Sequence, residues 1–308
     1  MCQNRGVIGI ILGLGSAAIF GVSTVITRRG VLRVSSNYIA TISIFTGPLF
    51  FLLITGITGD IFGLSQFPWR AYVYLALSGI VHFALGRTWA YKSLQIVGST
   101  RSNVVTNLNP VVSIVLAMII LKETVTPLMV FGILLSLGGP LLIVLKERGA
   151  KGNQFIALDR RTLCIGMLYG MGAAVFWGSS SIFVKLGLEH GGSPISGSLI
   201  AYLAASIVIS PPSFLNGGNR KEIFGGDKKS LRVALLSGLT SSTAQLLRYL
   251  ALGYASVIVV SVLGRTLLLW VLLFSFIFNR QYESFSRWVL LGSGLLTIGT
   301  ILVLIPWS

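Results

Sequence analysis

The chain has 308 residues, of which 54% are hydrophobic and 10% are charged, and its formal net charge is +16. A water-soluble domain carries roughly a quarter charged residues because charge must cover its surface, so this composition excludes a soluble enzyme, a disulfide scaffold and a disordered chain. The basic residues are scattered through short loops between apolar runs, which excludes a free nucleic-acid-binding domain. The solvent of this protein is therefore predicted to be lipid.

Apolar runs long enough to cross a membrane recur along the whole chain. A bilayer core about 30 Å thick requires roughly 20 apolar residues per helix. The sequence supplies ten such spans, near residues 7–27, 36–57, 71–91, 102–121, 127–145, 163–184, 195–215, 233–252, 254–278 and 286–306. The first span ends in Thr27, Arg28 and Arg29 instead of a small-residue cleavage site, so we expect a helix and not a signal peptide.

Two internal repeats organise these spans. Residues 9–30 align without gaps to residues 166–187, with the identical pairs Gly9/Gly166, Gly13/Gly170, Gly15/Gly172, Ala17/Ala174, Gly21/Gly178, Ser23/Ser180 and Gly30/Gly187. A second correspondence places residues 123–139 over residues 283–299. The sequence thus predicts repeats at 1–150 and 151–308. Five spans per repeat is an odd number, so the second repeat enters the membrane in the opposite sense, as in secondary transporters.

Several motifs resemble a known family. They are the run AAVFWGSS at 173–180, the Asn109-Pro110-Val111 of span four and the Leu121-Lys122-Glu123 that follows it. With the two-repeat plan they resemble the drug/metabolite transporter superfamily, EamA type. The resemblance implies an all-α membrane protein with ten transmembrane helices in two inverted five-helix repeats, located in the plasma (inner) membrane as a multi-pass protein. One departure is that Gly264 and Arg265 stand in the second repeat where Asn109 and Pro110 stand in the first.

The Lys and Arg residues predict the orientation, because basic loops stay in the cytoplasm. Loops and ends on the amino-terminal side hold 4 basic residues and those on the opposite side hold 17. This bias predicts that both termini are non-cytoplasmic, whereas members of the family usually have cytoplasmic termini.

Three arginines fall inside the spans, where a cation at the centre of a helix costs roughly 2.5 to 3.5 kcal/mol. Arg87 lies near the end of its span, so its side chain either reaches the interface or faces the bundle. Arg248 shares a polar helical face with Ser237, Ser241 and Gln245. Arg265 lies deep inside span nine and is either a binding residue or the structural partner of a carbonyl group.

Acidic residues are missing from the middle of every span. This absence disfavours a proton-coupled cation exporter with a buried glutamate. It predicts a positive cavity, in which an anionic group pairs with the guanidinium groups of Arg265 and Arg248.

The remaining candidate site residues are uncharged. His82 lies in the middle of span three and is either a proton relay or a neutral histidine hydrogen-bonded within the bundle. Asn103, Asn107, Ser23 and Ser180 lie on polar helix faces, where such groups often only join neighbouring helices. Trp177 either closes over a ligand or packs in the bundle. Pro110 is expected to break or kink span four.

We therefore expect a secondary transporter of small organic anions or zwitterions, such as amino acids, carboxylates or phosphorylated metabolites. It would rock its two halves around a central cavity by alternating access, with Arg265, Arg248, His82, Asn103, Asn107, Trp177, Ser180 and Ser23 binding the substrate. The expected partners are the bilayer, a small molecule and a coupling proton or exchanged counter-substrate, with no cofactor and no nucleic acid. The alternative is an exporter or flippase of hydrophobic compounds or lipid-linked carriers. Enzymatic activity is not expected, because no buried nucleophile, acid pair or metal cluster is present.

Overall fold

The computed structural model describes residues 2–31, 36–150, 159–215, 228–278 and 287–305, and every regular element within these ranges is helical. Five stretches of the described chain are long and apolar enough to cross a membrane: Gly6–Thr27, Thr41–Thr58, Arg160–Glu189, Val257–Phe274 and Arg287–Leu304. Shorter apolar helices at Asn109–Ile120, Pro127–Leu142 and Pro194–Ser210 fall on three more of the predicted spans. The fold is that of an all-α membrane protein.

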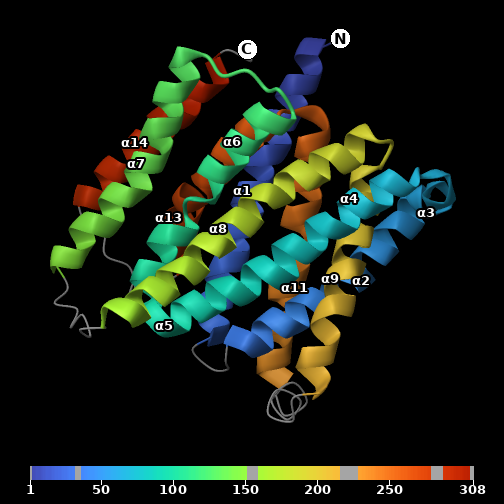
Figure 1. Cartoon of the computed structure of the whole chain (residues 1–308), viewed down its shortest axis with the longest axis horizontal. Helices are drawn as coiled ribbons and strands as arrows, with labels where there is room; N and C mark the ends of the chain where they lie inside the picture. Colours follow the sequence, from blue (N-terminus) through green and yellow to red (C-terminus); the bar gives the residue numbers. More distant parts are fainter. Residues whose placement is uncertain (1, 32–35, 151–158, 216–227, 279–286, 306–308) are drawn as a thin grey trace.

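The helices follow the order of the ten predicted spans (Figure 1). The first half contains α1 (Cys2–Val31), α2 (Ser36–Thr58), α3 (Asp60–Gly63), η1 (Leu64–Gln66), α4 (Trp69–Gly79), η2 (Ile80–Gly86), α5 (Arg87–Thr106), α6 (Asn109–Ile120) and α7 (Pro127–Ala150). The second half contains α8 (Arg160–Glu189), α9 (Pro194–Leu215), α11 (Lys228–Tyr254), α12 (Val257–Leu263), η3 (Gly264–Thr266), α13 (Leu267–Phe278) and α14 (Arg287–Leu304).

Three of the spans change their helical geometry in mid-course. Span three contains η2, a π-helical stretch between α4 and α5. Span four is broken between α5 and α6, and Pro110 lies in the first turn of α6, where its missing N–H group leaves no helical bond unmade. The predicted break at Pro110 is thus confirmed. Span nine is broken at the matching place, where the 3₁₀ turn η3 separates α12 from α13.

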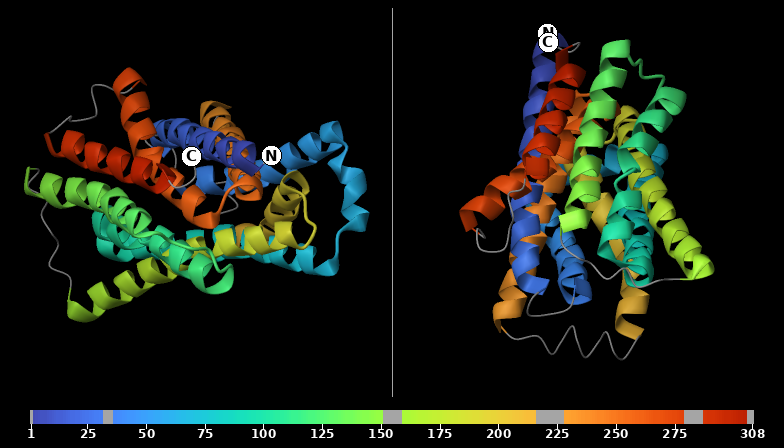
Figure 2. Two further views of the ribbon diagram at one scale, coloured as in Figure 1. Left: turned by 90° about the horizontal axis from the view of Figure 1, so that it is seen from above. Right: turned by 90° about the vertical axis from the view of Figure 1, so that its left-hand side faces the viewer.

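The two halves of the sequence are interleaved. α1 packs most extensively on α11, α8 packs on α4, α5 and α6, and α7 packs on α14. Figure 2 shows the α7 and α14 pair side by side in both views, and its right-hand view shows the start of α1 and the end of α14 at the same end of the molecule. The largest helix contacts therefore join the two halves of the chain to each other.

Equivalent glycines of the two repeats make equivalent close contacts between helices. A methyl group added at Gly21 of α1 would come within 2.8 Å of Trp270, on α13. A methyl group at Gly178, the equivalent position of α8, would come within 2.6 Å of the backbone oxygen of Asn109, at the start of α6. Each repeat therefore uses the same glycine to approach the broken span of the other repeat. The boundary between the repeats at residue 150 stays a prediction, since residues 151–158 lie outside the described ranges.

Two charged side chains fix the turn between α11 and α12, at the end of the molecule near the termini. The carboxylate of Glu123 accepts hydrogen bonds from the backbone N–H groups of Val257 (2.7 Å) and Ile258 (3.0 Å), the first residues of α12. Lys185 Nζ donates to the carbonyl oxygens of Leu252 (3.0 Å) and Ala255 (3.2 Å), at the end of α11. We call Glu123 and Lys185 the turn clamp. Each charge is opposite in sign to the partial charge of the helix end that it contacts, so both interactions are favourable.

Candidate functional site

A cavity of about 340 Å³ lies between the two halves of the chain. Its walls come from α1, η2, α6, α8, α11, α12, η3 and α13. Its lining consists of Gly13, Ser16, Ala17, Phe20, His82, Asn109, Ser113, Trp177, Ser181, Gln245, Arg248, Val260, Ser261, Gly264, Arg265 and Leu267. The lining contains two arginines and no acidic residue, so the cavity is positively charged within the described part of the chain.

Arg265 joins the two broken spans. It lies on η3, and its Nη1 and Nη2 atoms donate to the side-chain oxygens of Asn107 (3.3 Å) and Asn109 (3.4 Å), on either side of the break in span four. Its Nε–H is buried and has no hydrogen-bond partner among the described residues. A buried N–H without a partner destabilises the protein by about 1 to 3 kcal/mol. The guanidinium group therefore keeps bonding capacity that the protein does not use.

Arg248 enters the cavity from α11. Its Nη1 donates to Oε1 of Gln245 (3.3 Å) and its Nη2 donates to the hydroxyl of Ser181. Both partners are neutral, so among the described residues only dipoles solvate the positive charge of Arg248. Since Arg248 and Arg265 line the same cavity, a ligand with a negative group would find two donors of charge-assisted hydrogen bonds there.

His82 lies on the π-helical stretch η2 and lines the cavity. Its Nδ1 is 2.9 Å from the hydroxyl of Ser180 and its Nε2 is 3.2 Å from Nε2 of Gln245. Its backbone oxygen accepts a hydrogen bond of 3.0 Å from the indole N–H of Trp177. Single π-helical turns are frequent at functional sites, and this one holds Trp177 in place at the cavity wall.

The structure brings six of the predicted site residues together around the cavity. Arg265, Arg248, His82 and Trp177 line it, Asn107 contacts Arg265, and Ser180 lies behind His82. Ser180 is 1% exposed and its hydroxyl donates to the backbone oxygen of Trp177, so it supports the wall without lining the cavity.

Of the two other predicted residues, Ser23 stands apart from this group. Ser23 is buried outside the cavity lining, where its hydroxyl donates to the backbone oxygen of Ser237 (3.3 Å). It therefore joins α1 to α11, which is the structural role that polar residues of membrane helices commonly have. The side chain of Asn103 lies outside the described part of the chain, and the backbone of this residue belongs to α5.

The lining also contains polar residues outside the predicted set. Gln245 lies on the same polar face of α11 as Arg248, and Ser181 follows Ser180 on α8. Asn109 lies at the predicted break of span four. Helical spacing from an arginine and closeness to a helix break were the signals that could have found Gln245 and Asn109. Among the described residues no group of three or more His, Cys, Asp and Glu side chains could hold a metal ion.

Comparisons with known proteins agree with this architecture. The model of the EamA-like transporter family matches residues 7–145 and again residues 164–305. A protein of Bacillus subtilis (strain 168) described as "Uncharacterized transporter YvbV" is 32% identical over 148 residues, and the matched segment spans 47% of this chain and 47% of that relative, about half of its length. A solved structure titled "Crystal structure of protein" superposes with a TM-score of 0.76 at 16% identity, over 97% of this chain and 95% of the other. At that identity the likeness concerns the fold alone.

Proposed function

The chain belongs to the EamA-like transporter family, and we propose that it carries small organic anions across the membrane by alternating access. The observation that supports this substrate class is the pair of guanidinium groups in the cavity, whose side-chain partners are all neutral. An anion would supply the opposite charge that the described lining lacks. Arg265 would bind it through Nε and Nη atoms, and Arg248 would bind a second acceptor atom.

The lining favours an anion over a zwitterion or a cation. An ammonium group would meet two positive charges and no carboxylate in the described lining, which is unfavourable in a site of low dielectric constant. Phe20, Val260 and Leu267 give the cavity an apolar wall. A carboxylate or phosphate joined to a compact apolar body therefore fits both parts of the lining.

The alternative function is the export of hydrophobic or lipid-linked compounds, in which Arg265 would be structural. A structural guanidinium group is expected to have its N–H groups satisfied by the protein. The described residues offer no acceptor to Nε of Arg265, which favours the anion carrier.

Alternating access would move bundles that combine helices from both halves, because α1 packs on α11 and α8 packs on α4 and α5. At the end near the termini, residues 257–260 of α12 are at most 6% exposed and belong to a continuous apolar core. At the opposite end of α6, in the break of span four, Asn107 is exposed. We therefore propose that the cavity opens towards the end opposite the termini.

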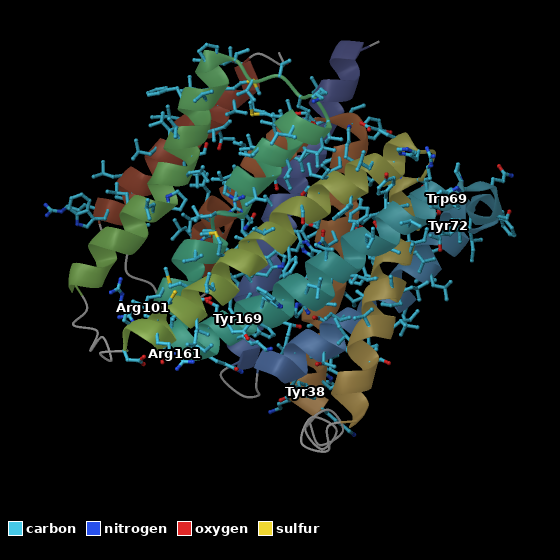
Figure 3. All side chains as sticks on the ribbon, viewed as in Figure 1. Tyr38, Trp69, Tyr72, Arg101, Arg161 and Tyr169 are labelled. Atoms are coloured by element: carbon cyan, nitrogen blue, oxygen red, sulfur yellow. The ribbon has the colours of Figure 1, made fainter. Side chains whose placement is uncertain are left out.

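Basic residues of the described chain lie at that end. Figure 3 shows Arg101 and Arg161 at this end of the bundle, away from the two termini marked in Figure 1. By the positive-inside rule it would face the cytoplasm of a cell whose plasma membrane holds the protein, with both termini outside. A basic entrance would also concentrate anions near the cavity. A reporter fused after Ser308 that is active only in the cytoplasm would contradict this orientation.

Ligand-dependent thermal stabilisation of the purified protein tests the substrate class. Three compounds of similar shape serve as probes: 3-phenylpropanoate, 3-phenylpropylammonium and zwitterionic phenylalanine. We expect the anion to raise the unfolding temperature most and the cation least. The effect should disappear in Arg265→Ala and persist in Arg70→Ala, which removes an exposed positive charge beside Trp69. Preferential stabilisation by the cation would overturn the proposal, and uptake of the anion into proteoliposomes would complete the test.

A further inference from the structure

A hydrogen-bonded chain connects Arg248 to His82 through Gln245, and all three residues line the cavity. From this chain we propose that His82 is a proton-binding site coupled to the anion site, so that each anion moves together with one proton. The inference rests on the proposed function, because it requires an anion at Arg248. It identifies the coupling ion and the residue that carries it.

The donors and acceptors in the chain can be arranged in one way. A guanidinium group has only N–H donors, so Gln245 must turn its Oε1 towards Nη1 of Arg248, at 3.3 Å. The amide N–H of Gln245 then points at Nε2 of His82, 3.2 Å away. That nitrogen must accept and therefore carries no proton.

The proton of the neutral ring is consequently on Nδ1, which donates to the hydroxyl of Ser180 at 2.9 Å. Ser180 in turn donates to the backbone oxygen of Trp177 at 2.8 Å. The chain runs in one direction from Arg248 to Trp177, and Nε2 of His82 is the atom at which a proton can be added. In this arrangement the amide N–H of Gln245 donates a hydrogen bond to that atom, which blocks the addition of a proton.

An anion at Arg248 would release this block. A carboxylate or phosphate oxygen is a stronger acceptor for a guanidinium group than an amide oxygen is. When Nη1 turns to the anion, the amide of Gln245 is free to rotate by half a turn and present Oε1 to His82. A proton from the aqueous phase then adds to Nε2, which donates to Gln245. The bond from Nδ1 to Ser180 does not change, because Nδ1 is the donor in both forms.

The charges around His82 make the two binding events depend on each other. Charged and titratable groups lie on every element packed around η2. They are Lys228, Lys229, Arg232, Arg248, Tyr249 and Tyr254 on α11, Arg87, Tyr91, Lys92 and Arg101 on α5, Tyr202 on α9, Arg160, Arg161, Cys164, Tyr169, Lys185 and Glu189 on α8, and Arg70, Tyr72 and Tyr74 on α4. The one carboxylate among them, Glu189, is exposed at the last residue of α8, nine residues beyond Ser180, and Lys185 is held at the α11–α12 turn. A cationic His82 would face Arg248 until the anion brings a negative charge. The anion therefore strengthens proton binding, and the proton strengthens anion binding equally.

Calorimetry on the purified full chain measures this coupling directly. Binding of 3-phenylpropanoate is followed in buffers of different ionisation enthalpy, which reveals the protons taken up for each anion bound. We expect uptake of up to about one proton and a dissociation constant that rises with pH by up to about tenfold for each pH unit. In His82→Gln the uptake should vanish and the affinity should become independent of pH.

Two further variants separate coupling from a general loss of structure. Gln245→Leu keeps His82 and both arginines but removes the connection, so proton uptake should fall while anion binding remains measurable. His190→Gln removes the second histidine, whose Nδ1 lies 2.8 Å from the backbone oxygen of Leu186, and should keep the full uptake. Anion binding without proton uptake, or uptake that survives His82→Gln, would overturn the inference and leave the anion carrier intact. Failure of every anionic probe to bind would overturn both.

Discussion

The turn clamp and the cavity treat charged side chains in opposite ways. At the turn clamp, both carboxylate oxygens of Glu123 accept backbone N–H groups of α12, and Lys185 donates to two backbone oxygens near the end of α11. In the cavity, Arg248 and Arg265 donate to neutral side chains, and one N–H of Arg265 has no partner among the described residues.

This difference separates charges that hold the fold from charges that await a ligand. A side-chain charge that binds the backbone groups of a helix end is attracted by the opposite partial charge of that end, and this attraction offsets the cost of its desolvation. A guanidinium group that meets only side-chain amides and hydroxyls leaves much of that cost uncompensated. The turn clamp should therefore govern stability, and the cavity arginines should govern binding.

Removing the carboxylate of the turn clamp should have the largest effect on stability. In Glu123→Ala the N–H groups of Val257 and Ile258, which are 0% and 1% exposed, lose their acceptors. We expect the free energy of unfolding to fall by about 2 to 5 kcal/mol, and by less in Glu123→Gln, which keeps one acceptor. Thermal unfolding in detergent measures both. Glu189→Ala removes an exposed carboxylate and should change stability by less than about 0.5 kcal/mol. Equal stability of Glu123→Ala and Glu189→Ala would refute the structural role of Glu123.

Exchanging arginine for an uncharged side chain in the cavity should have the opposite consequence. Arg265→Met retains most of the volume and removes an uncompensated charge, so stability should be unchanged or rise by up to about 3 kcal/mol. Stabilisation by 3-phenylpropanoate should be lost in the same variant. Lys185→Met should show the reverse, with lower stability and an anion response that is retained. A large loss of stability in Arg265→Met would remove the distinction between the two regions.

Adding one methyl group at the packed end tests how tightly it is closed. A Cβ atom at Gly9 would lie 2.7 Å from Cβ of Ala255, beside the turn clamp. Gly9→Ala should therefore lower the free energy of unfolding by about 1 to 3 kcal/mol. At Gly56 of α2 a Cβ atom would meet nothing within 4 Å, so Gly56→Ala should raise stability by about 0.4 to 1 kcal/mol. Similar unfolding temperatures for the two variants would show that the packed end rearranges to accept the added methyl group.

The sequence predicts the architecture well because lipid imposes simple rules. Apolar length and the repeated glycines are local signals, and they were sufficient to place the spans and the inverted repeat. Arg265 and Arg248 were found because a charge inside an apolar span is conspicuous. The break at Pro110 was predictable from the missing N–H group of proline.

The rest depends on contacts between residues far apart in the chain. Ser23 and Ser180 occupy equivalent positions in the two repeats, yet Ser23 bonds to α11 and Ser180 bonds to His82. Helical periodicity gives the same description of both, so it cannot separate them. The π-helical stretch η2 has no sequence signal that we recognise. The interleaving of the halves also follows only from the packing of whole helices.

The smallest expected effect concerns a charge at an exposed helix end. Asp159 caps α8, and hydrogen bonds from the hydroxyl and the backbone N–H of Thr162 hold the pKa of its carboxyl below the ordinary value. A lowered pKa in the folded state means that the carboxylate stabilises the fold above the ordinary pKa of aspartate. This stabilisation is lost as the pH falls through the folded-state value. On acidification, the unfolding temperature of the wild type should therefore fall relative to that of Asp159→Asn, because asparagine caps a helix without titrating. Asp159→Ala should be the less stable of the two variants at every pH. Since solvent screens this carboxylate, the change in the free energy of unfolding should be smaller than the change caused by Glu123→Gln. A larger change at Asp159 would mean that exposure to solvent does not weaken the structural charges of this protein.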